Sequence, residues 1–134
     1  MLPSIVVSTV DVGRLESLIG GLGARDPAAV ALTRELDRAD FAEPWELPPT
    51  VVSMNSTVRF MVEDTREQFT LTLVYPKDCA VDGQCLSVLT PVGTALLGMS
   101  AGDVIEWPTP GGVQVSLRVL EVVYQPERAG AFHL

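Results

Sequence analysis

The stretch that says most about the fold is residues 86–99, LSVLTPVGTALLGM. Its first four residues predict a short strand, and Thr90-Pro91 then predicts a short helix. A threonine hydroxyl can cap a helix, and proline at the first helical position loses no hydrogen bond. Gly98 indicates where that helix stops. The helix has one apolar face that is expected to cover a sheet, formed by Val92, Ala95 and Leu96.

The residues on both sides of this stretch alternate between apolar and polar types, as β-strands do. Strands are expected over residues 57–63, 69–73, 86–89, 104–107 and 113–124. The polar residues 64–67 predict a hairpin between the first two strands, and Pro108 to Gly112 predict a rigid turn. The expected fold is therefore α+β, with a mainly antiparallel sheet of five or six strands and one short helix.

The first forty residues have helical periodicity instead. Two apolar stripes recur at three- and four-residue steps: Val12, Leu15, Leu18, Ile19 and Leu22, then Ala29, Leu32, Leu36 and Ala39. Thr9 or Asp11 could cap the first helix, and Asp26 followed by Pro27 is expected to cap the second. The charged positions of the second helix, Arg34, Glu35, Asp37, Arg38 and Asp40, are expected on its other faces.

Glycines at 20, 21 and 23 separate the two helices, so the pattern predicts a short antiparallel helical hairpin. Arms of this length span roughly 20 Å at 1.5 Å per residue. Residues 44–49 hold three prolines and cannot continue a helix. We therefore expect a helical hairpin over 1–45 and a β domain over 46–134.

Composition excludes several classes of protein. The chain has 134 residues, with 9 Lys and Arg against 17 Asp and Glu, a net charge of −8 that argues against a large polyanion-binding surface. A hydrophobic share of 47% argues against disorder. The N-terminus lacks a basic region and no apolar run reaches about 20 residues, so a cytoplasmic protein is expected. Trp45 and Trp107 lack basic neighbours and are expected to be packing residues.

No catalytic or metal constellation stands out. Cys79 and Cys85 are expected to be two reduced thiols, and His133 is the single histidine. Asp78 and Asp82 near the cysteines could hold a metal, although a solvated loop is the more ordinary explanation. The glycines at 20–23 follow a helix instead of a strand, so they do not form a dinucleotide-binding loop. No cofactor is expected.

Beyond composition, residues 51–124 resemble the C-terminal domain of the Gre transcript-cleavage factors. The resemblance is carried by residues 86–99, then Gly102-Asp103 and Pro110-Gly111-Gly112. Within this group, the chain most resembles a bacterial relative of the Gre factors, the regulators of nucleoside diphosphate kinase (the Rnk family). This more specific resemblance rests on residues 52–56, 73–76, 124–127 and, in the second helix, 35–39.

The resemblance implies an FKBP-like C-terminal domain, an N-terminal coiled-coil hairpin and docking on RNA polymerase near its secondary channel. The exposed face of the turn 90–98 would then grip the polymerase, although core packing is the alternative role for the same residues. The partner-binding residues implied are Thr90, Pro91, Val92, Gly93, Thr94 and Leu97. Sequence-specific nucleic-acid binding and membrane binding are not expected.

The resemblance further implies a comparison with the Gre factors, in which two acidic residues at the hairpin tip hold a catalytic Mg²⁺. Here the tip, residues 20–26, offers one acid, Asp26, which is expected to cap a helix and lies beside Arg25. A carboxylate occupied by backbone amides is a poor metal ligand, and the arm is short. We therefore predict a non-enzymatic regulator that docks on polymerase, competes with Gre-type factors and does not stimulate transcript cleavage.

Two alternatives stay open. An FKBP-like prolyl isomerase needs an aromatic-lined pocket, but aromatic residues make up 6% of the chain. Its candidates, Phe60, Phe69, Tyr75 and Trp107, are expected in the core. Direct binding to nucleoside diphosphate kinase is the other alternative, whereas the main hypothesis makes any effect on that kinase indirect.

Overall fold

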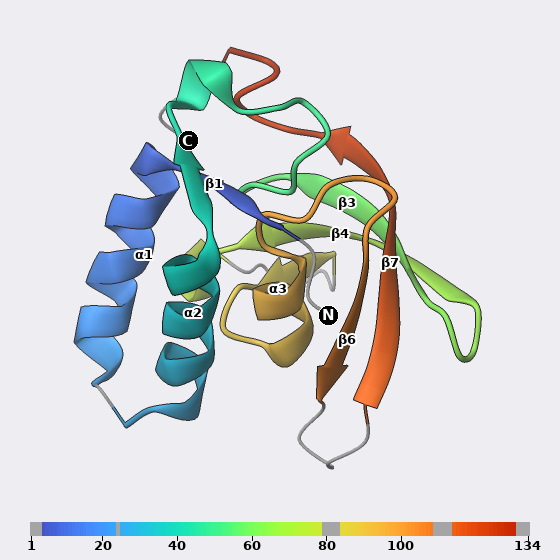
Figure 1. Ribbon diagram of the computed structural model, residues 1–134, viewed down its shortest axis with the longest axis horizontal. Helices are drawn as coiled ribbons and strands as arrows, with labels where there is room; N and C mark the ends of the chain where they lie inside the picture. The colour runs from blue at the N-terminus through green and yellow to red at the C-terminus, as the bar shows by residue number, and fades with distance from the viewer. Residues whose placement is uncertain (1–3, 24, 79–83, 109–113, 131–134) are drawn as a thin grey trace.

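A computed structural model describes residues 4–23, 25–78, 84–108 and 114–130 (Figure 1). The elements are β1 (Val6–Ser8), α1 (Thr9–Leu22), α2 (Pro27–Arg38), β2 (Asp40–Ala42), the 3₁₀ turn η1 (Pro44–Glu46), β3 (Thr57–Val62), β4 (Glu67–Val74), the 3₁₀ turn η2 (Pro76–Asp78), β5 (Cys85–Ser87), α3 (Pro91–Leu96), β6 (Val104–Pro108) and β7 (Gln114–Tyr124). The protein is α+β, with two N-terminal helices side by side and a five-stranded sheet.

The large sheet has the strand order β5-β4-β3-β7-β6. The expected hairpin is present, since β3 pairs antiparallel with β4 over Thr57–Val62. β7 joins β3 to β6 through two more antiparallel pairings. β5, however, runs parallel to β4, with Thr72 opposite Cys85 and Val74 opposite Ser87. The sheet is therefore mainly antiparallel, as expected, with one parallel pairing at this edge.

A second, two-stranded sheet was not expected from the sequence. β1 and β2 pair in parallel at either end of the helical segment, with Val6 opposite Asp40 and Ser8 opposite Ala42. The Asp40 amide donates to the Ile5 carbonyl at 2.9 Å, and the Val6 amide donates to the Gly98 carbonyl at 3.1 Å. β1 thus ties the base of both helices to the turn after α3.

Gly98 is required at that crossing. Its φ of 78° lies in the left-handed region, and a Cβ there would lie 2.9 Å from the Ile5 Cβ and 3.1 Å from the Val6 carbonyl oxygen. The glycine that was expected to end α3 therefore also makes room for β1.

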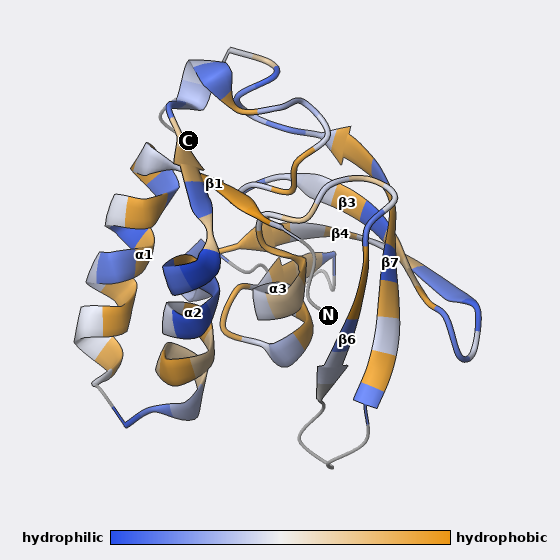
Figure 2. Ribbon diagram, viewed as in Figure 1, coloured by the Kyte–Doolittle hydropathy of each residue, from blue (hydrophilic) through white to orange (hydrophobic). Residues whose placement is uncertain are grey.

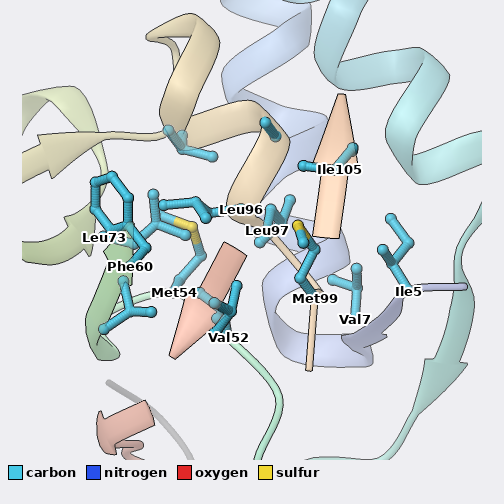
Figure 3. Packing of buried hydrophobic residues seen from close by; sticks show 14 of the residues in the cluster. Ile5, Val7, Val52, Met54, Phe60, Leu73, Leu96, Leu97, Met99 and Ile105 are labelled. Atoms are coloured by element: carbon cyan, nitrogen blue, oxygen red, sulfur yellow. The ribbon is translucent and has the colours of Figure 1, made fainter. Parts of the chain in front are cut away.

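The helices and the large sheet share one hydrophobic core. Leu15 of α1 and Leu32 and Leu36 of α2 belong to the same cluster of buried side chains as the inner residues of the sheet. Figure 3 shows its centre, where Leu96 and Leu97 lie among Val7, Met54 and Met99. Apolar and polar residues alternate along β7, and the polar end of α2 leads into β2 (Figure 2). The division of the chain at residue 45 stays a prediction.

The helix caps confirm two expectations and correct one. An Asp26 Oδ1 accepts from the Ala28 amide at 2.9 Å and the Ala29 amide at 3.3 Å, as expected for α2. The Thr90 Oγ1 accepts from the Gly93 amide at 3.1 Å at the start of α3. The cap of α1 is neither Thr9 nor Asp11 but Ser8, whose Oγ accepts from the Asp11 amide.

Four further expectations fail. Phe69 is 39% exposed instead of lying in the core, because it stands in the first half of β4, whose side chains are exposed. Glu35 is 2% exposed instead of facing solvent, because its carboxylate pairs with Arg38 at 2.7 Å on a face that packing covers. Trp45 is 67% exposed instead of packed, because it stands on the short turn η1 beyond the core. Cys85 is disulfide-bonded and not a reduced thiol; Cys79 lies outside the described residues.

Candidate functional site

The turn that the sequence singled out as a partner-binding surface begins at Thr90. The Thr90 hydroxyl both caps α3 and donates to the Ser87 carbonyl at 2.7 Å, which fixes the helix to the end of β5. Pro91 is exposed at the first helical position, while Thr90 and Val92 are half-buried. These three residues form the part of the turn that is open to a partner, and we call them the α3 surface.

The other three candidate residues face inward. Thr94 is 1% exposed, and its hydroxyl donates to the Val88 carbonyl at 2.7 Å. Leu97 is fully buried in the core. A Cβ on Gly93 would lie 2.1 Å from the Ser87 carbonyl oxygen, so only glycine lets α3 pack this closely against the end of β5. Gly93, Thr94 and Leu97 therefore hold the turn in shape; direct contact of the turn with a partner stays a prediction.

The segment between the two helices carries one cation and one acid, Arg25 and Asp26. α1 ends at Leu22, Gly23 has a φ of 90°, and the Asp26 amide donates to the Gly23 carbonyl at 3.3 Å. The Asp26 carboxylate is engaged by the two α2 amides, and Arg25 beside it is exposed. With 14 and 12 residues, α1 and α2 span roughly 21 and 18 Å.

Neither metal nor membrane features stand out. Within the described ranges, no three His, Cys, Asp or Glu side chains come together in a group that could hold a metal ion. Asp82 and His133, considered in the sequence, lie outside those ranges. None of the described helices has the length and apolarity needed to cross a bilayer.

A polar junction joins α1 to the sheet. Asp11 is 2% exposed, and its Oδ2 accepts from the Met54 amide at 3.1 Å. Burial raises the pKa of the Asp11 carboxyl from 3.8 to about 7, and the charge of Glu127 adds to this increase, while the Met54 amide and Arg14 oppose it. The Glu127 Oε1 accepts from the Ser53 hydroxyl at 2.6 Å. The sequence pattern indicated only a capping role for Asp11 and not this junction with Met54.

One signal in the sequence could have indicated it. Asp11 stands four residues before Leu15, on the apolar stripe of α1, where an acid is unexpected unless its carboxylate has a buried partner. The exposure of Phe41 and Trp45 had no such signal in the sequence, because both residues stand in short elements without any periodic pattern.

The chain matches two family models that together span most of its length. Residues 47–124 match the model described as transcription elongation factor GreA/GreB, C-terminal. Residues 3–41 match the model described as Rnk N-terminus.

Individual relatives agree with both models. The chain is 44% identical to the regulator of nucleoside diphosphate kinase of Escherichia coli K12, over 98% of each chain. It is 31% identical to transcription elongation factor GreA of Aliarcobacter butzleri, over 70% of this chain and 58% of that one. Among solved structures, a prokaryotic transcription elongation factor GreA/GreB from Nitrosomonas europaea is 52% identical with a TM-score of 0.73, over 91% of this chain and 99% of that one.

Proposed function

The chain belongs to the Rnk branch of the GreA/GreB family, and on this premise we propose that it docks on RNA polymerase near the secondary channel without stimulating transcript cleavage. Its relatives are regulators and transcription factors by name. In this proposal the protein occupies the rim of the channel and competes with Gre-type factors. The large sheet and α3 correspond to the FKBP-like domain of the family, and α1 and α2 correspond to its antiparallel hairpin.

Docking through the α3 surface is supported by how firmly the turn is built. The Thr90 hydroxyl, the Thr94 hydroxyl and the closely packed Gly93 all fix α3 to β5, so the α3 surface is presented in one conformation. A preorganised surface loses little entropy on binding. Pro91 adds an exposed apolar ring at the centre of the α3 surface.

The absence of cleavage activity is supported by the tip. A second catalytic Mg²⁺ needs free carboxylate oxygens delivered at the correct distance. Asp26 is the one acid in residues 20–26, its carboxylate caps α2, and the cation Arg25 lies next to it. The single observation that carries the proposal is this occupied carboxylate at the end of a helix pair of only about 20 Å.

Binding is tested by co-purification of the full chain with core RNA polymerase. Pro91→Glu is expected to lower binding at least tenfold, because it places a charge on the α3 surface while leaving the Thr90 cap in place. Gln68→Glu is the matched control, since it adds the same charge to an exposed position of β4. Equal binding by Pro91→Glu and the control would place the contact elsewhere. Thr94 is unsuitable for such a substitution because its hydroxyl is buried and bonded.

Cleavage is tested on stalled elongation complexes at neutral pH, with a GreA protein as the positive control. The chain is expected to leave the rate of transcript cleavage unchanged and to inhibit GreA-stimulated cleavage at saturating concentration. Rapid cleavage by the chain alone would refute the proposal for the tip.

The link to nucleoside diphosphate kinase comes from the name of the Escherichia coli relative. We propose that any effect of this protein on the kinase is indirect and acts through transcription. The activity of purified nucleoside diphosphate kinase is therefore expected to stay unchanged when the purified protein is added.

A further inference from the structure

A small groove lies on the helix pair, between the last turns of α1 and the first half of α2. Ile19 of α1 lines it, together with four residues of α2: Ala29, Val30, Thr33 and Arg34. Its volume is about 290 Å³, and it is partly open to solvent. Figure 2 shows apolar residues at this end of both helices, whereas the end of α2 nearer to β2 is polar. The two helices therefore leave a gap in their packing that a partner can reach.

The size and the lining of the groove suit the side chains of another protein. Small-molecule sites usually have about 300–1,000 Å³ and enclose most of the ligand, so this groove is at the lower limit for a metabolite. The Thr33 hydroxyl is already engaged, since it donates to the Ala29 carbonyl at 2.7 Å. Val30 is 36% exposed, so an aliphatic side chain in the groove would remove apolar surface from water.

Arg34 gives the groove its charge. It is the one charged residue of the lining and is exposed, and within the described part of the chain its guanidinium forms no ion pair. Two acids stand near it along α2, but Glu35 pairs with Arg38, and Asp37 is not paired with Arg34. Ala24, the one residue between the helices that lies outside the described ranges, has no charge. An acidic partner would therefore meet a cation that has no acid beside it in the groove.

We propose that this groove docks an acidic protein segment, with an aliphatic side chain in the gap and a neighbouring carboxylate on Arg34. The net charge of −8 repels acidic partners in general, so a partner is accepted only where its charges match this local pattern. A nucleic acid does not fit, because a single cation neutralises too few phosphates. The inference is independent of docking through the α3 surface and adds a contact made by the helix pair.

The test is an NMR titration of the full chain with the peptide acetyl-Glu-Leu-Glu-Glu-Leu-Glu-amide. The peptide is expected to shift the amide resonances of Ile19, Val30 and Arg34 in a saturable manner. Two comparison peptides, one with Gln for every Glu and one with Ala for every Leu, should each bind more weakly, because each lacks one of the two contacts. No polymerase is present, so failure here leaves the co-purification test of the proposed function unaffected.

Two variants locate the site. Arg34→Gln should weaken binding of the acidic peptide about two- to fivefold, as the loss of one exposed ion pair predicts. Val30→Glu should weaken it by about tenfold or more, because it puts a like charge at the groove and removes apolar contact surface. The matched controls are Arg66→Gln in the β3–β4 turn and Gln68→Glu on β4, which make the same changes of charge at exposed positions away from the groove and should bind like the parent.

Thermal unfolding of each variant at the parent temperature would show that lost binding is not lost folding. The proposal is overturned if the acidic peptide shifts no resonances at the groove, if either comparison peptide binds as tightly, or if either groove variant binds as the parent does. Shifts at the groove that depend on the concentration of the chain alone would also overturn it, since the occupant would then be a second copy.

Discussion

Replacing Gly93 with alanine should strongly destabilise the protein, although the change adds only one methyl group. The new Cβ would lie 2.1 Å from the Ser87 carbonyl oxygen and 2.9 Å from the Thr90 Oγ1, both well inside ordinary van der Waals contact at 3.4–4 Å. The first obstacle is backbone, so α3 has to move away from the end of β5. Overpacking of this kind costs about 3 kcal/mol, at the upper end of the usual range. Loss of the Thr90 cap would add about 1 kcal/mol.

The matched control is Gly13→Ala on α1, where a Cβ meets nothing within 4 Å. That change should stabilise the protein by up to about 1 kcal/mol, because alanine favours a helix over glycine. Urea and thermal unfolding followed by circular dichroism measure both variants, and Gly93→Ala should melt about 10 °C or more below the parent. If Gly93→Ala unfolds within 1 kcal/mol of the parent, the close packing of α3 against β5 is not what holds the turn.

Three further changes test other parts of the fold. Asp11→Asn should flatten the pH dependence of stability, because folding raises the pKa of Asp11 from 3.8 to about 7. The parent should therefore lose stability relative to the variant as the pH rises from 4 to 7. A constant difference in the free energy of unfolding across that window, measured by urea titration, would contradict this. Gln125→Met should cost about 2 kcal/mol, since the buried Gln125 Nε2 donates to the Pro48 and Val51 carbonyls, both at 2.8 Å; an unchanged urea midpoint would show those bonds to be dispensable. Asp26→Ala should cost about 1 kcal/mol in the same assay while Asp26→Asn costs little, because asparagine also caps a helix; equal losses would point to charge and not to capping.

The sequence predicts local structure well where neighbouring residues alone determine it. Asp26-Pro27 and Thr90-Pro91 each pair a capping side chain with a proline that needs no amide partner, and both helices begin there. The β3–β4 hairpin follows from strict alternation on either side of a polar turn. These signals are contained within a few neighbouring residues.

The features that were missed depend on partners far along the chain. β1 and β2 have three residues each, too few to show alternation, and they exist because Ile5 and Val6 meet Gly98. Asp11 is buried because the Met54 amide is there to bond it, and Thr94 and Leu97 turn inward because α3 covers the sheet. The same dependence explains why three of the six predicted partner-binding residues, Gly93, Thr94 and Leu97, are buried.

The crossing of β1 over Gly98 also has a consequence for biosynthesis. Val6 is synthesised long before Gly98, whose amide in turn donates to the Val52 carbonyl, so the docking place of β1 is assembled only after α3 has been translated. Until then α1 and α2 carry exposed leucines without the core that covers them, a state prone to aggregation.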